Sequence, residues 1–464
     1  MLTELQIQNF KAWRDTGPIR LAPLTIIFGA NSAGKSSLGH LLLALKQTAR
    51  LADRKRALHL GDLQSDIDLG TFKDCLYQHN LKAKLSFMLG WKLPVPLTIT
   101  DPLNKKAAFP ADHLRLSTTL RADARGLPMV EQFSYALLHE NQTTLNVTHG
   151  LDARGKAKLD VKPMRLIHAL GRKWDVEPPE KFYRFSDVTL ARYQNADALA
   201  VLPLELERLL DGLVYLGPLR EPPQRTYHWA GDTVPNVGAR GEYAIAAILA
   251  AADAGRELNR CYKQRRQRFD TFIAAWLKDL GVIHSFNVRP IAKGRKEYEV
   301  VVRTRANGPD VKLTDVGFGV SQVLPALVQA FYAPPHSTVW MEQPEIHLHP
   351  KVQAELADAF ISAVQAYENG RPRNVQLVIE SHSEHFLLRL QRRVAERLLE
   401  PEDVAVYFVR DGNTGAQLEE LKLNRFGEIE NWPEGFFGDD LGEIAARTKA
   451  AMQRQMNDGG VLHG

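Results

Sequence analysis

The segment at 29–36 constrains the fold more than any other part of this chain, because it reads Gly-Ala-Asn-Ser-Ala-Gly-Lys-Ser. It fits the phosphate-binding pattern GxxxxGKS/T at every fixed position. An apolar run at 24–28 precedes it, and residues 38–46, whose apolar positions have helical spacing, follow it. A strand, a glycine-containing loop and a helix in that order are what the motif requires. The sequence therefore predicts an α/β fold whose parallel sheet carries this loop at the end of a strand.

The residue types in this loop indicate ATP and Mg²⁺ as its ligands. Glycines allow the backbone to curl so that its N–H groups face the phosphates, and the helix that follows presents its positive end to them. We expect Lys35 to reach the β- and γ-phosphates and Ser36 to place its hydroxyl on Mg²⁺. The residues predicted to contact the nucleotide here are Gly29, Ala30, Asn31, Ser32, Ala33, Gly34, Lys35, Ser36 and Ser37.

A second apolar segment, at 338–341, ends at Glu342 and has the character of a Walker B strand. The carboxylate of such a strand must meet Mg²⁺ at the strand's carboxyl end. We therefore predict Ser36 and Glu342 as metal ligands. Taken alone, a strand followed by glutamate is a weak signal, and an ordinary strand end is the alternative.

Two further segments fit the same site. The turn at 317–322 opens a helix expected from Ser321, and its residues suited to anion contact are Gly317, Gly319, Ser321 and Gln322. The alternative is a loop with an N-capping serine. His382 follows a predicted strand at 375–379, where a purely structural histidine is the alternative.

The rest of the chain divides by pattern. Short alternating stretches at 82–88, 114–120, 133–138 and 143–148 predict a β-rich lobe, and 256–268 reads as a strongly basic helix. That helix either contacts DNA backbone or is an ordinary solvated face. The acidic residues of the tail fit a solvated segment better than a nuclease metal site; they are Glu434, Asp439, Asp440 and Glu443.

Composition narrows the class of protein. Two cysteines without CxxC spacing argue against a disulfide framework or a zinc site, and no apolar run approaches the roughly 18 residues that a membrane span needs. The N-terminus lacks the pattern of a secretory leader. We therefore expect a cytoplasmic protein with no membrane partner. A net charge of +5 permits contact with nucleic acid without requiring it.

Taken together, the motifs resemble those of SMC/RecF-type ABC ATPases. Their order is Asn-Phe-Lys at 9–11, the loop at 29–36, GxGxSQ at 317–322, EQPEIHLHP at 342–350 and ESHSEHFLLRL at 380–390. They look most like the OLD-like branch of AAA ATPases associated with bacterial anti-phage defence. The resemblance covers 1–80 and about 215–440, including YLGPLR at 215–220 and WPEGFF at 432–437.

The resemblance implies an α/β ABC-type ATPase head with a β-rich N-terminal lobe and an inserted lobe. The corresponding division of the chain is 1–100 for the first part of the head, 101–214 for the insertion, 215–400 for the second part and 401–464 for a strand and tail extension. Such heads form a homodimer, or a higher homo-oligomer, with two ATP molecules between protomers. Gly319 and Ser321 would then cap the γ-phosphate bound by the partner, and His382 would sense it.

One position departs from the family pattern. Where most ABC ATPases carry a glutamate after the Walker B acid, this chain has Gln343, and an amide cannot accept a proton as a carboxylate does. Either Glu345 replaces it as general base or turnover is slow, and we favour slow turnover. The predicted catalytic residues are Glu342, Gln343, Glu345 and His382.

Two functions follow from this resemblance. We favour a nucleotide-controlled switch in a defence system, acting with a separate effector such as a nuclease. The alternative is a RecF-like ATPase that binds DNA directly in repair. A transporter subunit fits poorly, because 307 residues separate Lys35 from Glu342 (342 − 35).

Overall fold

The computed structural model describes residues 1–30, 33–62, 65–172, 174–261, 263–412 and 415–433, together with 447, 449, 450 and 452. At its centre lies a six-stranded sheet in which all strands run parallel except the last, β22. In spatial order the strands are β10 (Leu213–Leu216), β17 (Thr338–Glu342), β20 (Gln376–Glu380), β4 (Leu24–Gly29), β21 (Val404–Gly412) and β22 (Gly415–Leu421). The predicted α/β fold with a parallel-sheet core is confirmed.

Helices cover both faces of this sheet. The helices of the described structure are α1 (Lys35–Arg50), α2 (Phe72–Cys75), α3 (Asp187–Ala191), α4 (Val201–Asp211), α5 (Ala244–Asp253), α6 (Phe269–Asp279), α7 (Phe318–Tyr332), α8 (Pro350–Gln365) and α9 (Glu384–Ala395); α1 and α4 cover one face of the sheet and α5–α9 the other. Short 3₁₀ turns are η1 (Tyr77–His79), η2 (Ala196–Ala200), η3 (Leu313–Asp315) and η4 (Pro401–Asp403). Within the described ranges, no helix is both long enough and apolar enough to cross a membrane.

Side chains alternate between two apolar clusters along the central strands, as the two-residue period of a strand requires. Ile27, Trp340 and Val378 belong to the cluster that contains α1 and α4. Their neighbours Met341 and Ile379 belong to the cluster that contains α5–α9. The sheet is therefore the middle of three layers, and every second residue of β17 and β20 faces α1.

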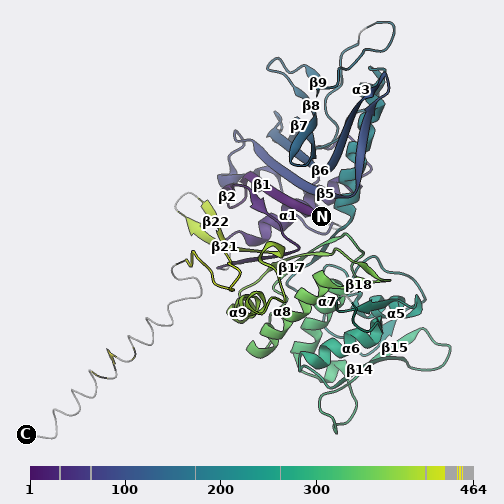
Figure 1. Cartoon of the computed structure of the whole chain (residues 1–464), viewed down its shortest axis with the longest axis vertical. Helices are drawn as coiled ribbons and strands as arrows, with labels where there is room; N and C mark the ends of the chain where they lie inside the picture. The colour runs from purple at the N-terminus through teal and green to yellow at the C-terminus, as the bar shows by residue number, and fades with distance from the viewer. Residues whose placement is uncertain are drawn as a thin grey trace, which may run out of the picture.

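A second sheet is entirely antiparallel and continues from the N-terminal strands into the β-rich region. Its strands are β1 (Leu2–Phe10), β2 (Trp13–Asp15), β3 (Ile19–Arg20), β5 (Leu85–Asp101), β6 (Asn104–Ala122), β7 (Pro128–His139), β8 (Gln142–Leu151) and β9 (Ala157–Lys162). The four predicted strands overlap β5–β8, which are longer than expected because each pairs along most of its length. Figure 1 shows β5–β9 at one end of the molecule and α5–α8 at the other, with the N-terminus between them.

Two small sheets complete the described structure. One contains β11 (Tyr227–His228), β14 (Ser285–Pro290), β15 (Glu297–Arg303) and β16 (Val311–Lys312). The other contains β12 (Glu257–Asn259), β13 (Gln267–Arg268), β18 (Tyr367–Glu368) and β19 (Arg371–Pro372).

The prediction of a basic helix at 256–268 is wrong. β12 and β13 occupy both ends of this segment and pair with each other, and β12 also pairs with β18. The Arg256 guanidinium donates two hydrogen bonds to the Glu368 carboxylate, at 2.6 and 2.9 Å. Arg260 lies 2.6 Å from Asp279 and 3.9 Å from the centre of the Trp276 ring. These tertiary partners outweigh the local helical spacing of the charges.

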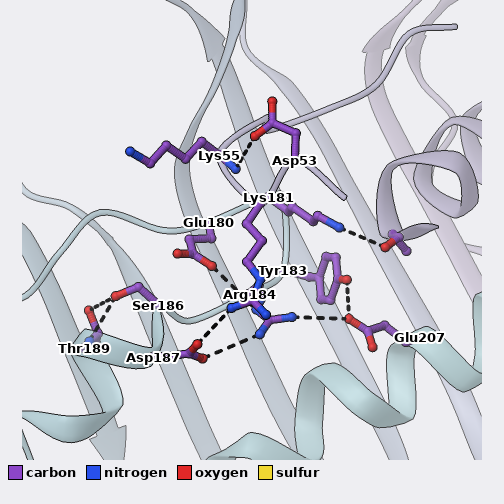
Figure 2. A network of polar contacts seen from close by, with 12 residues as sticks. Asp53, Lys55, Glu180, Lys181, Tyr183, Arg184, Ser186, Asp187, Thr189 and Glu207 are labelled. Atoms are coloured by element: carbon purple, nitrogen blue, oxygen red, sulfur yellow. Dashed lines mark hydrogen bonds and ion pairs between the residues drawn. The ribbon is translucent and has the colours of Figure 1, made fainter. Parts of the chain in front are cut away.

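The end of α1 that lies away from the phosphate loop is anchored by Lys181 (Figure 2). The Lys181 ammonium donates to the carbonyl oxygens of Ala49 at 2.9 Å and Leu51 at 2.8 Å. Carbonyls in the last turn of a helix lack partners within the helix, so a buried cation there satisfies them and complements the helix dipole. Nearby, Tyr183 Oη donates to Glu207 of α4 at 2.5 Å. The 180–187 segment therefore connects α1 to α4.

We expect Lys181→Met to lower the free energy of unfolding by about 1–3 kcal/mol, because two buried carbonyls lose a charged donor. Lys181 is only 4% exposed, so water cannot easily replace the ammonium. The measurement is a urea titration of both proteins. Lys55→Met is the matched control, since the Lys55 side chain is exposed in the same region, and it should change stability by less than about 0.5 kcal/mol. Equal losses in the two variants would contradict this role for Lys181.

Candidate functional site

Three neighbouring strands of the central sheet end together at one edge. β4 ends at Gly29, β17 at Glu342 and β20 at Glu380. Glu342 is the register partner of Glu380, which in turn pairs with Ile27 of β4. Because Glu342 and Glu380 have the same parity as Trp340 and Val378, both carboxylates point to the face covered by α1. The carboxyl edge of a parallel sheet is where such folds bind ligands.

The loop after β4 depends on two glycines. Gly29 has φ of 149° and Gly34 has φ of 99°, a region that L side chains rarely adopt. A Cβ atom at Gly29 would also lie 2.3 Å from the Val409 carbonyl oxygen, and one at Gly34 would lie 2.8 Å from Ala12 Cβ. Only glycine fits either position. Asn31 and Ser32 of the predicted loop lie outside the described residues.

The start of α1 fixes the other end of the loop. Gly34 is the N-cap residue, and the indole N–H of Trp13 donates to the Gly34 carbonyl oxygen and to Ser37 Oγ, both at 3.0 Å. Ser37, predicted to contact the nucleotide, is instead engaged with Trp13 and Gly34 through its side chain. Whether its backbone N–H also reaches a phosphate stays a prediction. Because the first N–H groups of an α-helix lack acceptors within the helix, this helix end is suited to an anion.

Lys35 places its ammonium against the loop. Its Nζ atom donates to the carbonyl oxygens of Gly29 at 2.8 Å and Ala30 at 2.7 Å. Burial lowers the pKa of the Lys35 ammonium, and the negative charge of three nearby glutamates opposes this shift. The side chain therefore lies between the phosphate-binding loop and the acidic strand ends, and a phosphate group would compete for the same donor.

The Ser36 hydroxyl lies between two carboxyl groups. Ser36 Oγ is 2.8 Å from Glu342 Oε2 and 2.8 Å from Glu380 Oε2. A serine hydroxyl has one proton to donate, so one carboxyl must itself be protonated for both contacts to be hydrogen bonds. Burial, followed by the negative charge of Glu342, raises the pKa of Glu380. We therefore assign the proton to Glu380.

Glu342 is held in the ionised form by its neighbours. Its Oε1 atom accepts a hydrogen bond from Tyr215 Oη at 2.6 Å and lies 3.5 Å from His40 Nε2. Burial alone would raise the pKa of Glu342, but the hydrogen bonds from His40, Tyr215 and Ser36 outweigh it and lower the pKa below its usual value. Arg220 donates to the Glu342 carbonyl oxygen at 3.2 Å and fixes the backbone at the same point.

The loop after β17 contacts the loop after β20. Glu345 Oε1 accepts hydrogen bonds from Ser381 Oγ at 2.8 Å and from the His382 backbone N–H at 2.7 Å. Burial raises the pKa of Glu345. Gln343 adopts φ of 45°, and its backbone N–H donates to the Glu380 carbonyl oxygen at 2.8 Å. Glu345 thus positions the segment that carries His382.

The His382 side chain is exposed, in contrast to the buried acids beside it. Partial desolvation, followed by repulsion from the Lys35 ammonium, lowers the pKa of His382. The neutral imidazole that this favours can donate or accept a hydrogen bond at the edge of the site. Its contact with a γ-phosphate stays a prediction.

The segment at 317–322 begins α7 earlier than predicted. The helix starts at Phe318 with Gly317 as N-cap, so the prediction of a helix from Ser321 is wrong by one turn, and Ser321 is not an N-cap. A Cβ atom at Gly319 would have Leu348 Cδ2 at 3.6 Å and the His347 carbonyl oxygen at 3.9 Å as nearest neighbours. Ser321 and Gln322 are buried.

Comparison with known families locates part of this site. Residues 247–387 match the family model of an AAA ATPase domain, and residues 399–446 match a model described as a protein of unknown function, DUF3696. The first match includes Glu342, Glu380 and His382 but not the loop at 29–36. Residues 247–387 are therefore similar to AAA ATPase domains. Comparison with curated proteins gave no match.

The solved structures to which this chain is similar include heads of SMC proteins. An Smc head bound to the C-winged helix domain of ScpA is 10% identical, with 91% of this chain and 98% of that chain covered and a TM-score of 0.40. The SMC head domain from Thermotoga maritima is 10% identical, with 90% and 98% covered and a TM-score of 0.39. The Smc head with an extended coiled coil, bound to the C-terminal domain of ScpA derived from Pyrococcus furiosus, is 9% identical, with 91% and 96% covered and a TM-score of 0.36. Likenesses this distant carry no statement about what the chain binds.

Sequence reasoning missed four side chains of this site. Glu380 lies beside Ser36 and accepts a hydrogen bond from Trp340, while Tyr215 and His40 hold Glu342. Glu380 had a detectable signal, because the predicted strand at 375–379 is followed by a glutamate just as the strand at 338–341 is. Tyr215 had only its place in the YLGPLR segment at 215–220, and Trp340 and His40 had no signal, because their roles depend on tertiary neighbours.

Proposed function

We propose that this chain binds Mg-ATP at the loop spanning 29–36 and hydrolyses it slowly. The observation that supports this best is the position of Ser36 in the first turn of α1, where its hydroxyl lies 2.8 Å from the Glu342 carboxylate. A P-loop serine and an acid at the end of a neighbouring strand are the protein groups that hold Mg²⁺ in P-loop enzymes. The two glycines, Lys35 and the N-terminal end of α1 fit a triphosphate beside them.

Each residue has a role in this proposal. Lys35 would exchange its loop carbonyls for phosphate oxygens, and Ser36 and Glu342 would hold the cation. Bound Mg²⁺ would neutralise charge on the phosphates as it builds up. Gly317, Gly319, Ser321 and Gln322 would act on the nucleotide of a second copy, in a homodimer or higher homo-oligomer. His382 would respond to the γ-phosphate.

Slow turnover follows from the groups near the reacting water. Gln343 can orient water but cannot take its proton. Glu345 accepts hydrogen bonds from Ser381 and His382 through one carboxylate oxygen, and this favours a role in positioning the segment that carries His382. We therefore expect the isolated protein to hydrolyse ATP well below the median enzyme turnover of about 10 s⁻¹. Phosphate release under saturating Mg-ATP measures it, and a turnover of tens per second would contradict the proposal.

At the cellular level we propose an ATP-controlled switch in anti-phage defence that acts on a separate effector protein. The resemblance of the motifs to the OLD-like branch supports this role. The DNA-repair alternative relied on a basic helix at 256–268, and Arg256 and Arg260 of that segment are instead paired with Glu368 and Asp279. Co-purification with a neighbour-encoded protein in the absence of DNA is the expected result. ATPase stimulation by DNA, with DNA affinity falling steeply with salt, would favour repair instead.

A further inference from the structure

Glu380 is a second buried acid at the Ser36 hydroxyl, and nothing in the P-loop or Walker B patterns calls for it. Its side chain is almost completely enclosed, with 1% exposure. One oxygen, Oε2, lies 2.8 Å from Ser36 Oγ. The other, Oε1, accepts a hydrogen bond from the Trp340 indole N–H at 2.7 Å. Both carboxyl oxygens of Glu380 therefore have a defined partner. The partner of Oε2 is Ser36, the residue expected to contact Mg²⁺.

The sheet register brings the two acids together at the hydroxyl. Glu342 and Glu380 are directly paired residues at the ends of β17 and β20, and each places an Oε2 atom 2.8 Å from Ser36 Oγ. Two carboxyl groups buried side by side are costly unless a cation or proton compensates them. Mg²⁺ in phosphate-binding sites is typically held by one or two carboxylates together with the phosphates.

Trp340 is placed to orient Glu380. It stands two residues before Glu342 on β17, and α1 packs directly on its ring at Gly39, where a Cβ atom would lie 2.6 Å from the indole. An indole held in this way can donate only in one direction. It therefore fixes Glu380 as outer partners fix the ligands of other metal sites.

We propose that Glu380 helps Ser36 and Glu342 to hold the divalent cation of Mg-ATP, so that two acids from adjacent strands set the metal dependence of nucleotide binding. This inference rests on the proposed Mg-ATP site and adds a residue to it. If Glu380 served only to accept the Trp340 hydrogen bond through Oε1, its Oε2 atom would not need to lie at the Ser36 hydroxyl. The position of Oε2 at Ser36 is what favours the metal.

The test is Glu380→Gln, which preserves size and an acceptor for Trp340 but, unlike the carboxyl group, cannot release a proton to become a negatively charged metal ligand. Mn²⁺ affinity in the presence of saturating ATPγS is measured by electron paramagnetic resonance, and ATPγS affinity in EDTA is measured separately. We expect Mn²⁺ affinity to fall about 10- to 100-fold, as for other residues that support metal ligands, with metal-free nucleotide affinity unchanged. Mn²⁺ affinity within twofold of the wild type would overturn the inference.

Controls separate charge, folding and the site itself. Glu384→Gln removes the same charge from the start of α9, four residues further along, and should leave Mn²⁺ affinity unchanged; an equal loss there would also overturn the inference. Glu380→Asp keeps the carboxyl group, but its shorter side chain draws that group back from Ser36. Should the glutamine variant fail to fold, Mn²⁺ affinity is measured in Glu380→Asp instead, and a loss of affinity is expected there too. Wild-type protein that binds no ATPγS at all would overturn the proposed function, whereas unchanged metal affinity in Glu380→Gln overturns the role of Glu380 alone.

Discussion

Lys35→Ala is expected to abolish detectable ATP binding while the protein remains folded. The Lys35 ammonium is the one lysine donor found within the described part of the phosphate loop, 2.7–2.8 Å from two of its carbonyl oxygens. A hydrogen bond to a charged group contributes about 1.5–3 kcal/mol, and about 1.4 kcal/mol corresponds to a tenfold change in affinity. Each lost phosphate contact should therefore weaken binding by about 10- to 100-fold. Titration of a fluorescent ATP analogue measures the change.

Lys73→Ala is the control for this prediction, because Lys73 lies exposed on α2, outside the candidate site. It should bind the analogue as the wild type does. Circular dichroism of both variants separates loss of binding from loss of fold. Retained affinity in a folded Lys35→Ala protein would mean that the loop is not the nucleotide site.

Gln343→Glu is expected to raise the rate of ATP hydrolysis by about 10²–10⁴, the usual contribution of a general base. The substitution changes an amide into a carboxylate at the residue that follows Glu342, without altering the backbone hydrogen bond to the Glu380 carbonyl oxygen. Steady-state phosphate release under saturating Mg-ATP measures the gain. The affinity for ATP should change far less than the rate.

Two variants show which group acts as the base. Gln343→Ala should hydrolyse ATP no faster than the wild type, since it offers neither a carboxylate nor an amide to the water. A Gln343→Glu rate within about twofold of the wild type, combined with loss of hydrolysis in Glu345→Gln, would contradict our account. Glu345 would then be the base, in addition to positioning His382.

The sequence was sufficient to predict the centre of the fold because its signals are local. The loop at 29–36 needs its glycines for backbone reasons alone, and the positive φ values of Gly29 and Gly34 match that expectation. The strands before Glu342 and Glu380 are apolar apart from Thr338 and Gln376, as is typical of parallel strands buried on both faces. Their order along the chain places their carboxyl ends on the same edge.

The sequence could not predict what depends on register and on distant partners. Glu380 meets Ser36 only because β20 pairs with β17 residue for residue, and no local pattern specifies that pairing. The error at 256–268 has the same origin. The helical spacing of its charges is real, but Glu368 and Asp279, which lie far away in sequence, determine the position of Arg256 and Arg260.

The most direct test of the central claim is a crystal structure of the protein with a non-hydrolysable ATP analogue and Mn²⁺, using the anomalous signal of manganese. The account predicts the triphosphate in the loop at 29–36, with Lys35 turned from its carbonyls to the phosphates and the manganese peak beside Ser36 Oγ and Glu342. Nucleotide bound elsewhere, or a manganese peak remote from both residues, would contradict it.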